Sequence, residues 1–472
     1  MSGGAGADAG LLIEGMASVA TLAGGLRRGA GQADAAELTA EAEGLAVAVW
    51  EDRILAAGPV PDVLRRIAAA GHGLESFARI DAGGCLVTPG LIDAHTHLVF
   101  AGTRENEWQL RLRGAGYLEV LAAGGGILST VAATRAASEE DLAAGARGRL
   151  SEMIANGTTT VEVKSGYGLD VATELRQLEV IGRLDREGPI RLVPTFLGAH
   201  AVPAEFRASG TGAGTGAGAG TGAGAGTGAD PAAADPTEAY VANVIHEQLP
   251  AVARQGIARF CDVFCEAGVF TADQTRRILS AAAAHGLSLR LHADELRPSG
   301  GAELAAELAT QFAGAGGCPS ADHLAAPSDE GVAALARAAA AGHAVVATLL
   351  PATSWFLGRH HFAPARRFID AGVPVALATD LNPGTSPTVS LPLVMSIACL
   401  EHGLTPAEAL VAVTVNAAHS LGLGREIGSI EPGKQADLVI WDVPTLNQIP
   451  YWLGARLART VVRQGRVIFA RG

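Results

Sequence analysis

The sequence has few cysteines, no long apolar run and no excess of positive charge. Its five cysteines have no zinc-finger spacing, which is typical of reduced thiols in a cytoplasmic protein. No apolar run is long enough to span a bilayer, and we expect no signal peptide, because the first ten residues lack its charged and apolar regions. A formal net charge of −13 argues against nucleic acid or an anionic membrane as a partner.

Apolar, strand-like runs recur through the middle of the chain, and helical patterns separate them. Helix-start signals fall between the runs: Ser-Glu-Glu-Asp at 138–141, Thr-Ala-Asp-Gln at 271–274 and Thr-Pro-Ala-Glu at 405–408. The eight runs are Leu91–Leu98, Thr158–Lys164, Arg191–Leu197, Cys261–Cys265, Leu287–Leu291, Ala321–Leu324, Ala344–Leu349 and Val373–Thr379. Eight strands with helical crossovers predict an α/β fold, a parallel (β/α)8 barrel of the TIM type; two open sheets are the competing topology.

Both ends of the chain have strand patterns of their own. Leu11–Leu22 and Leu45–Ala57 are expected strands near the start, and Thr460–Phe469 is an expected hairpin near the end. We therefore expect a small β-sandwich domain from residues 1–87 and 425–472, and a barrel domain over 88–424. Residues 23–44 predict a surface loop, and the Gly/Ala/Thr-rich residues 209–236 predict a flexible insert within the barrel.

Polar residues stand at the ends of the eight expected barrel strands, where such barrels carry their catalytic groups. His95 and His97 follow the first run, and residues i and i+2 of a strand point to the same side. The His-x-His pair by itself is a weak signal. The other strand ends carry Lys164, Tyr167, His200, Glu266, His292, Glu295, His323, Thr353, Ser354, Asp380, Asn382, Gly384 and Thr385. So many histidines and acidic residues at one rim of the expected barrel predict a metal-hydrolase site.

Three imidazoles and one carboxylate, those of His95, His97, His292 and Asp380, could hold a single divalent ion with one position open for water. Such an ion lowers the pKa of bound water to about 7, so hydroxide is available at neutral pH. The fourth strand ends in Glu266 and has no lysine to bridge a second ion, so we expect one metal.

Three further groups have two interpretations each. Glu295 could carry a proton for the reaction, or be a solvated carboxylate at a helix start. His323 could hydrogen-bond the attacked oxygen or the water, or be a buried structural histidine. Lys164 lies on the second strand, where we expect an ion-pair partner rather than a ligand.

Residues 89–97, Pro-Gly-Leu-Ile-Asp-Ala-His-Thr-His, resemble the opening signature of the amidohydrolase superfamily. Five segments resemble, more specifically, its imidazolonepropionase family: 95–104, 164–169, 196–203, 291–295 and 379–385. The similarity runs from about residue 86 to the C-terminus and lapses in the Gly/Ala/Thr-rich insert. It implies hydrolysis of 4-imidazolone-5-propanoate to N-formimino-L-glutamate in histidine degradation.

The resemblance also implies a cofactor and a set of site residues. The cofactor is one divalent or trivalent metal ion, zinc or iron, on the four ligands named above. The catalytic candidates, Glu295, His323 and Asp380, come from the strand-end argument above. The implied substrate contacts are Arg104, Tyr167, His200, Glu295, Asn382, Gly384 and Thr385, with Tyr117 as a weaker candidate. A homodimer is typical of the family.

The implied contacts each have a physical reason and a plainer alternative. Arg104 offers a planar fork for the substrate's carboxylate, although most arginines simply lie at the surface. Tyr167 could donate a hydrogen bond, or only pack. Asn382, Gly384 and Thr385 could bind an anion or a ring edge, or form an ordinary turn.

Two other functions compete. A cytosine- or guanine-type deaminase of the same superfamily would also use His292 and Glu295, but it needs a pocket for a planar base, and Arg104 and Tyr167 argue against that. A metal-free structural relative would have lost one or more ligands, and all four are present.

Overall fold

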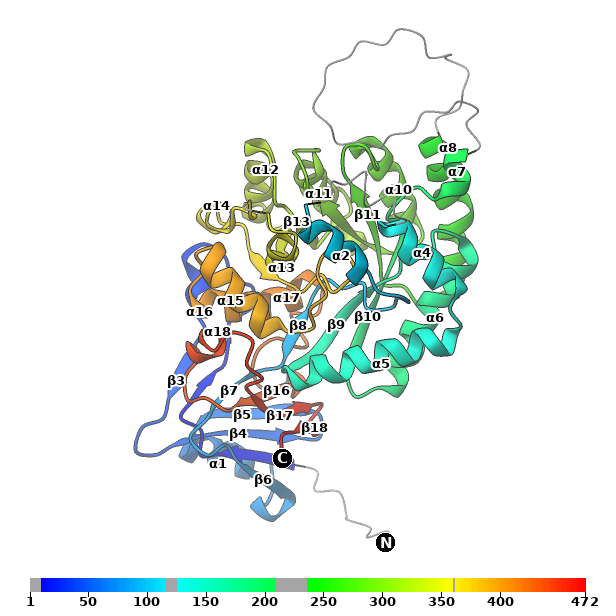
Figure 1. The fold of residues 1–472 in the computed structure, drawn as a ribbon. Coiled ribbons are helices and arrows are strands. Elements are labelled where there is room, and N and C mark those ends of the chain that lie inside the picture. The colour runs from blue at the N-terminus through cyan, green and yellow to red at the C-terminus, as the bar shows by residue number, and fades with distance from the viewer. Residues whose placement is uncertain (1–9, 115–124, 209–235, 360) are drawn as a thin grey trace.

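The computed structural model describes residues 10–114, 125–208, 236–359 and 361–472 (Figure 1). The predicted flexible insert, 209–236, lies outside these residues except for Pro236, which begins a helix. Tyr117 also lies outside them. Among the described residues, no helix combines the length and the apolar character needed to cross a membrane. All five cysteines are described, and each has a free thiol.

A sheet of eight parallel strands forms the centre of the larger part of the molecule, and its strands are neighbours in chain order. This confirms the predicted barrel. The strands are β8 (Leu91–Asp93), β9 (Thr158–Lys164), β10 (Arg191–Ala199), β11 (Phe260–Cys265), β12 (Ser288–Ala293), β13 (Ser320–His323), β14 (Val346–Leu349) and β15 (Val375–Leu377). The first and last are shorter than expected, so His95 and His97 lie just beyond the ladder of β8.

The barrel closes at the ends of its first and last strands. Thr96 forms a parallel bridge with Leu381. The amide of Asp380 donates to the carbonyl of His95 over 3.0 Å, and the amide of His97 donates to the carbonyl of Leu381 over 2.9 Å. Closure therefore places the His-x-His segment beside Asp380, although the two are far apart in the sequence.

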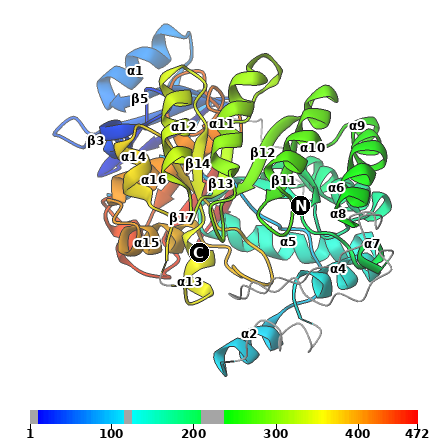
Figure 2. The same cartoon turned by 90° about the horizontal axis from the view of Figure 1, so that it is seen from above.

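Helices surround the strands, as Figure 2 shows from above. Capping boxes at Ser138, Thr271 and Thr405 begin three of them, as the sequence predicts. The longer helices of this part are α4 (Ile127–Ala136), α5 (Glu139–Ala155), α6 (Val171–Glu187), α10 (Ala272–Ala284), α11 (Gly301–Gln311), α12 (Asp329–Ala340) and α15 (Leu391–Glu401). The shorter ones are α2 (Glu105–Leu112), α7 (Ala204–Ala208), α8 (Pro236–Asn243), α9 (Leu249–Gln255), α13 (Pro351–Phe356), α14 (Ala365–Asp370), α16 (Pro406–Ala412), α17 (Val415–Ser420) and α18 (Gln448–Tyr451).

Two smaller sheets lie below the barrel in Figure 1. One has the order β5–β4–β1–β6 and the other β18–β17–β16–β7–β2–β3, so segments from both ends of the chain share the second sheet. Their bounds are β1 (Gly10–Glu14), β2 (Ser18–Ala20), β3 (Glu37–Thr39), β4 (Leu45–Trp50), β5 (Arg53–Pro59), β6 (Phe77–Asp81), β7 (Leu86–Pro89), β16 (Leu438–Trp441), β17 (Ala458–Arg463) and β18 (Arg466–Ala470), with helix α1 at Val60–Ala69. Leu11 and Val47 of one sheet share a buried core with Val87 and Ile440 of the other, which makes the pair a sandwich.

The prediction of a surface loop over residues 23–44 is wrong in part. A short 3-10 helix (Gly29–Ala33) and strand β3 fall within it. Gln32 is fully buried, donates to the carbonyl of Val375 at the start of β15 over 2.9 Å, and accepts from Asn416 over 2.9 Å. The segment therefore forms hydrogen bonds with buried polar groups of the barrel, and the composition of the segment does not reveal this role.

Candidate active site

The four predicted metal ligands converge where the barrel closes. The Nε2 atoms of His95 and His97 lie 3.6 and 3.5 Å from Oδ1 of Asp380. One nitrogen from each of His95, His97 and His292 lies within 4.8 Å of the other two, and His95, His323 and Asp380 form a second group of this kind. All five side chains are buried. The arrangement has the donors and the spacing of a metal centre.

The backbone turns sharply to bring two of these groups inward. His323 ends β13 with a φ of 72°, and Asp380, which follows β15, has a φ of 53°. Residues other than glycine adopt this left-handed region at a cost, and such strained residues are enriched at functional sites. His292, in contrast, lies within the regular ladder of β12.

The unpaired ring nitrogens show that a cation fits this centre. Nδ1 of His95 lies 2.6 Å from Asp322, and Nδ1 of His292 lies 3.1 Å from Asp262. Nε2 of both rings is buried and has no hydrogen-bond partner among the described residues. A buried polar atom without a partner costs about 1–3 kcal/mol, so these atoms suit a divalent metal ion.

The protonation of the imidazoles agrees with this chemistry. Burial holds the pKa of His95 and of His97 well below the usual value, so both rings are neutral and have a lone pair to share. Burial lowers the pKa of His292 too, but the Asp262 carboxylate outweighs it and raises that pKa overall. A metal ion on His292 would therefore compete with a proton, as is general for metal sites.

A layer of charged side chains lies beneath the histidines, and sequence reasoning found only one of them. As predicted, Lys164 is an ion-pair partner; its Nζ lies 2.7 Å from Asp262 and 2.9 Å from Glu162. Arg290 lies 2.9 Å from Asp322. A usable signal was present, because Glu162 and Lys164, like Arg290 and His292, alternate along apolar strands and so face the same side.

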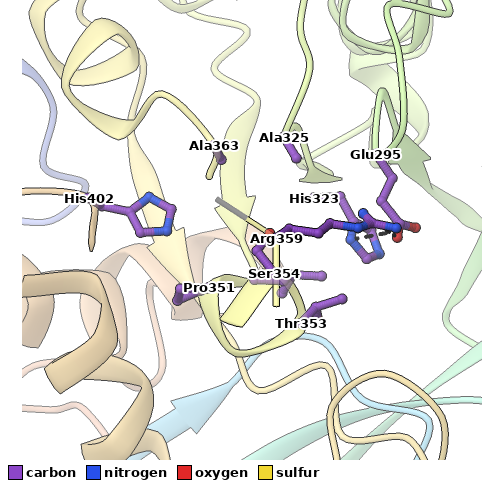
Figure 3. Close-up of a pocket in the computed structure, with 10 residues that line it drawn as sticks. Glu295, His323, Ala325, Pro351, Thr353, Ser354, Arg359, Ala363 and His402 are labelled. Atoms are coloured by element: carbon purple, nitrogen blue, oxygen red, sulfur yellow. Dashed lines mark ion pairs between the residues drawn. The ribbon is translucent and has the colours of Figure 1, made fainter. Parts of the chain in front are cut away.

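A small pocket, drawn in Figure 3, borders the centre at His323, and no residue of the charged layer lines it. Oε2 of Glu295 lies 3.8 Å from Nδ1 of His323, and its Oε1 lies 3.6 Å from Arg359, a residue the sequence did not single out. Thr353 donates to Oδ2 of Asp380 over 2.6 Å, and Ser354 lines the pocket. Glu295, the predicted proton carrier, therefore lies next to His323, which in turn lies close to Asp380.

His200 and Tyr167 flank His97. The ring of His200 stacks on that of His97, with centroids 4.8 Å apart, and its Nδ1 donates to the carbonyl of Gly166 over 2.9 Å. Burial lowers the pKa of His200 to about 3 and raises that of Tyr167, with Asp380 adding to the second shift. Glu174 was missed by sequence reasoning; its carboxylate accepts from the amides of Gly166, Gly168 and Leu169 and so holds the loop that carries Tyr167.

Arg104 is already partly engaged. Its Nε and Nη2 donate to Glu107 over 2.8 and 2.7 Å, and Arg111 contacts the same carboxylate. Its Nη1 lies so close to Gly384 that a Cβ there would overlap it. The structure thus brings Arg104 and Gly384 together and adds Glu107, which fixes the guanidinium.

The polar groups of the loop after β15 form hydrogen bonds with one another. The Oδ1 of Asn382 accepts from the amides of Gly384 and Thr385 over 2.9 and 2.8 Å, and its Nδ2 donates to the carbonyl of Asp380 over 2.7 Å. Asn382 therefore holds the turn that presents Asp380. Glu266 likewise holds a loop, since it accepts from Leu296 and Ser299.

Comparisons with known proteins place the chain in a family. It is 50% identical over 426 residues to an imidazolonepropionase of Geobacillus kaustophilus, covering 90% of each chain. It is 46% identical over 463 residues to one of Symbiobacterium thermophilum, covering 98% of each. A model of the amidohydrolase family matches residues 86–468. The chain belongs to the amidohydrolase family, in its imidazolonepropionase branch.

Solved structures of two deaminases share the fold at low identity. A zinc-bound adenosine deaminase of Xanthomonas campestris superposes with a TM-score of 0.64 at 20% identity, covering 98% of this chain and 93% of that one. A 5-methylcytosine deaminase of Klebsiella pneumoniae has a TM-score of 0.66 at 16% identity and covers 98% of both chains. At these identities the likeness shows the barrel and its accompanying sheets alone.

Proposed function

We propose that this amidohydrolase hydrolyses the cyclic amide C–N bond of 4-imidazolone-5-propanoate to N-formimino-L-glutamate, a step in histidine degradation to glutamate. The relatives at 45–50% identity are named imidazolonepropionases, and this supports the substrate. One observation supports the hydrolytic chemistry above all. The side chains of four buried residues lie close together, and ring nitrogens among them have no hydrogen-bond partner among the described residues; the four are His95, His97, His292 and Asp380.

Those four side chains would hold a single divalent ion, zinc or iron. When bound, the ion acts as a Lewis acid and lowers the pKa of a water molecule, which makes a nucleophile available at neutral pH. The neutral rings of His95 and His97 and the orientation of His95 and His292 by carboxylates favour such binding.

The chain's own residues would carry the protons. His323 lies in one group with His95 and Asp380, where it can donate to the oxygen of the attacked ring carbonyl as negative charge develops. Glu295, which lies 3.8 Å from His323, or Asp380 would relay a proton to the leaving ring nitrogen. Catalytic hydrogen bonds are often longer in ligand-free structures than in the substrate complex, so this distance is compatible with the role.

The substrate's propionate would bind Arg104, whose guanidinium Glu107 holds in place. Tyr167 and His200, which flank His97, would contact the ring, and Glu295 would contact it from the pocket side. Asn382, Gly384 and Thr385 would line the site next to Arg104. Holding the substrate at both ends fixes the ring beside the metal centre.

The test is hydrolysis of enzymatically made imidazolonepropionate, with and without a chelator. We expect turnover that a chelator abolishes and that zinc or iron(II) restores. Release of ammonia from a panel of cytosine- and guanine-type bases, without turnover of imidazolonepropionate, would instead make the protein a deaminase. Purified protein that contains no metal and binds none would make it a structural relative.

The proposal extends to the organisation of the protein. We infer a sandwich domain from residues 1–87 and 425–472 and a barrel domain from 88–424 with an insert at 209–236, which the shared sheet of the two chain ends supports. The free thiols support a cytoplasmic location. A homodimer is expected, and light scattering of the purified protein would test it.

A further inference from the structure

Lys164 is the centre of a fully buried charge cluster. Its Nζ lies 2.7 Å from Asp262, 2.9 Å from Glu162 and 3.5 Å from Asp322, and none of the four side chains is exposed. The chain has only two lysines, Lys164 and Lys434, and otherwise uses arginine as its cation. A lysine here offers a compact charge with three donors, which can face three carboxylates at once.

Each of the three carboxylates holds a different part of the candidate metal centre. Asp262 accepts from the amide of His292 over 3.1 Å and lies 3.1 Å from its Nδ1. Asp322 lies 2.6 Å from Nδ1 of His95. Glu162 accepts over 3.3 Å from the amide of Thr96, the residue between the two histidines of the His-x-His segment.

The cluster depends unequally on its two cations. Asp322 faces Arg290 at 2.9 Å as well as Lys164. Among the residues the structure describes, Lys164 is the only lysine or arginine within ion-pair distance of Asp262. A buried carboxylate that loses its cation is strongly destabilised and moves or takes up a proton. Loss of Lys164 would therefore act first on Asp262, and through it on the ring of His292.

We propose that Lys164 is a positioning residue for the metal centre, which through Asp262 and Asp322 fixes the rings of His292 and His95 and so sets the affinity for a divalent cation. This rests on the metal site of the proposed function. Lys164 itself is no ligand, because its ammonium is occupied by carboxylates.

The test compares Lys164→Met with Lys434→Met. Lys434 is the matched control, since it also bridges buried groups, donating to the carbonyl of Gly424 over 2.8 Å and to Ser429 over 2.6 Å, but contacts none of the candidate ligands. Affinity for Zn²⁺ and Co²⁺ is measured by competition with a chromophoric chelator, and the visible spectrum of the Co²⁺-loaded protein is recorded. We expect Lys164→Met to weaken binding by about 10- to 100-fold, the range for residues that support metal ligands, and to change the Co²⁺ spectrum. Lys434→Met should change neither.

A second variant covers the case in which Lys164→Met does not fold. Glu162→Gln added to Lys164→Met removes one charge of each sign, so the cluster keeps its net charge while Asp262 still lacks its cation. We expect the double variant to fold and to bind Zn²⁺ as weakly as predicted for the single one. Unfolding by urea, with and without chelator, separates stability from affinity.

Unchanged Zn²⁺ affinity and an unchanged Co²⁺ spectrum in the Lys164 variants, with lower stability alone, would overturn the inference and leave Lys164 a structural residue. The proposed function fails in a different way, when the wild-type protein itself binds no metal or does not turn over imidazolonepropionate.

Discussion

The two sides of the candidate metal centre differ in the burial of their side chains and in the lengths of their contacts. Beneath it, Lys164, Asp262 and Asp322 are wholly buried, with contacts of 2.6 to 3.1 Å to the rings and to one another, apart from one of 3.5 Å. On the pocket side, Glu295 is 15% exposed and its contacts to His323 and Arg359 are 3.8 and 3.6 Å. The buried side has one arrangement, whereas the pocket side has room to adjust. The first suits holding an ion, and the second suits a substrate that must enter and leave.

This difference predicts the largest loss of metal and of turnover at His292, where the buried side and the pocket side meet. His292→Ala removes a ring that is oriented from below and faces the centre, so both metal and turnover should be abolished. Metal content after dialysis and the rate of imidazolonepropionate loss measure this. His285→Ala, which changes an imidazole at the C-terminal end of α10, is the control. Full activity in His292→Ala would rule out the proposed centre.

A substitution on the buried side should lower both the free energy of unfolding and the affinity for the metal ion. Asp322→Ala leaves Arg290 without its nearest carboxylate and His95 without its orienting partner, so we expect a loss of about 3–5 kcal/mol in the free energy of unfolding, measured by urea with chelator present. Asp329→Ala, which removes an exposed ion pair with Arg367, should cost about 1 kcal/mol or less. Equal losses of unfolding free energy in the two variants would show that the buried charges contribute no more to stability than an exposed ion pair.

A change on the pocket side should affect turnover without affecting stability. Glu295→Gln keeps the size of the side chain and removes its proton-carrying role, so kcat should fall by about 10²- to 10⁴-fold. The midpoint of thermal unfolding should stay close to that of wild type, because the contacts of Glu295 are long. Glu330→Gln, at an exposed ion pair with Arg337, should alter neither quantity. An undiminished kcat in Glu295→Gln would remove Glu295 from the mechanism.

Arg104→Ala should mainly raise KM. The guanidinium would bind the propionate in substrate and transition state alike, so kcat should change little while KM rises by about 10- to 100-fold, in line with about 1.5–3 kcal/mol for a hydrogen bond to a charged group. Arg113→Ala, at an exposed position on the same stretch of chain, is the control. A KM that does not move would show that the carboxylate docks elsewhere.

Arg359→Met should have the smallest effect. The Arg359 side chain is 35% exposed and its contact with Glu295 is 3.6 Å, and such pairs contribute about 0–1 kcal/mol. Steady-state kinetics should therefore show a change in kcat of less than about tenfold, with an unchanged unfolding midpoint. A loss as large as that in Glu295→Gln would mean that Arg359 fixes the carboxylate and that the pocket side is as rigid as the buried side.

Much of the architecture could be predicted from the sequence. The eight strands were found because each is a short apolar run between helix signals, and the capping boxes at Ser138, Thr271 and Thr405 follow from local hydrogen bonding alone. The candidate ligands could be chosen because parallel barrel strands all deliver their C-terminal ends to one rim. Both arguments use only short-range chemistry and topology.

The partners of the site residues could not be predicted. Asp262 stands opposite Arg290 in the pairing of β11 and β12, and His292 stands opposite Asp322 in that of β12 and β13. A shift of one residue would turn these side chains to the other face of the sheet. The pairing of Arg104 with Glu107 and the self-contained turn of Asn382 likewise depend on how loops fold back.

The sequence by itself determined which groups stand at the strand ends, because alternation and apolar runs are local properties of the chain. Only the tertiary structure decided that His95 and His97 meet Asp380, because that contact needs the first and last strands to join across the barrel. It also decided that Lys164 faces three carboxylates rather than solvent, since the burial of a charge depends on everything that packs around it.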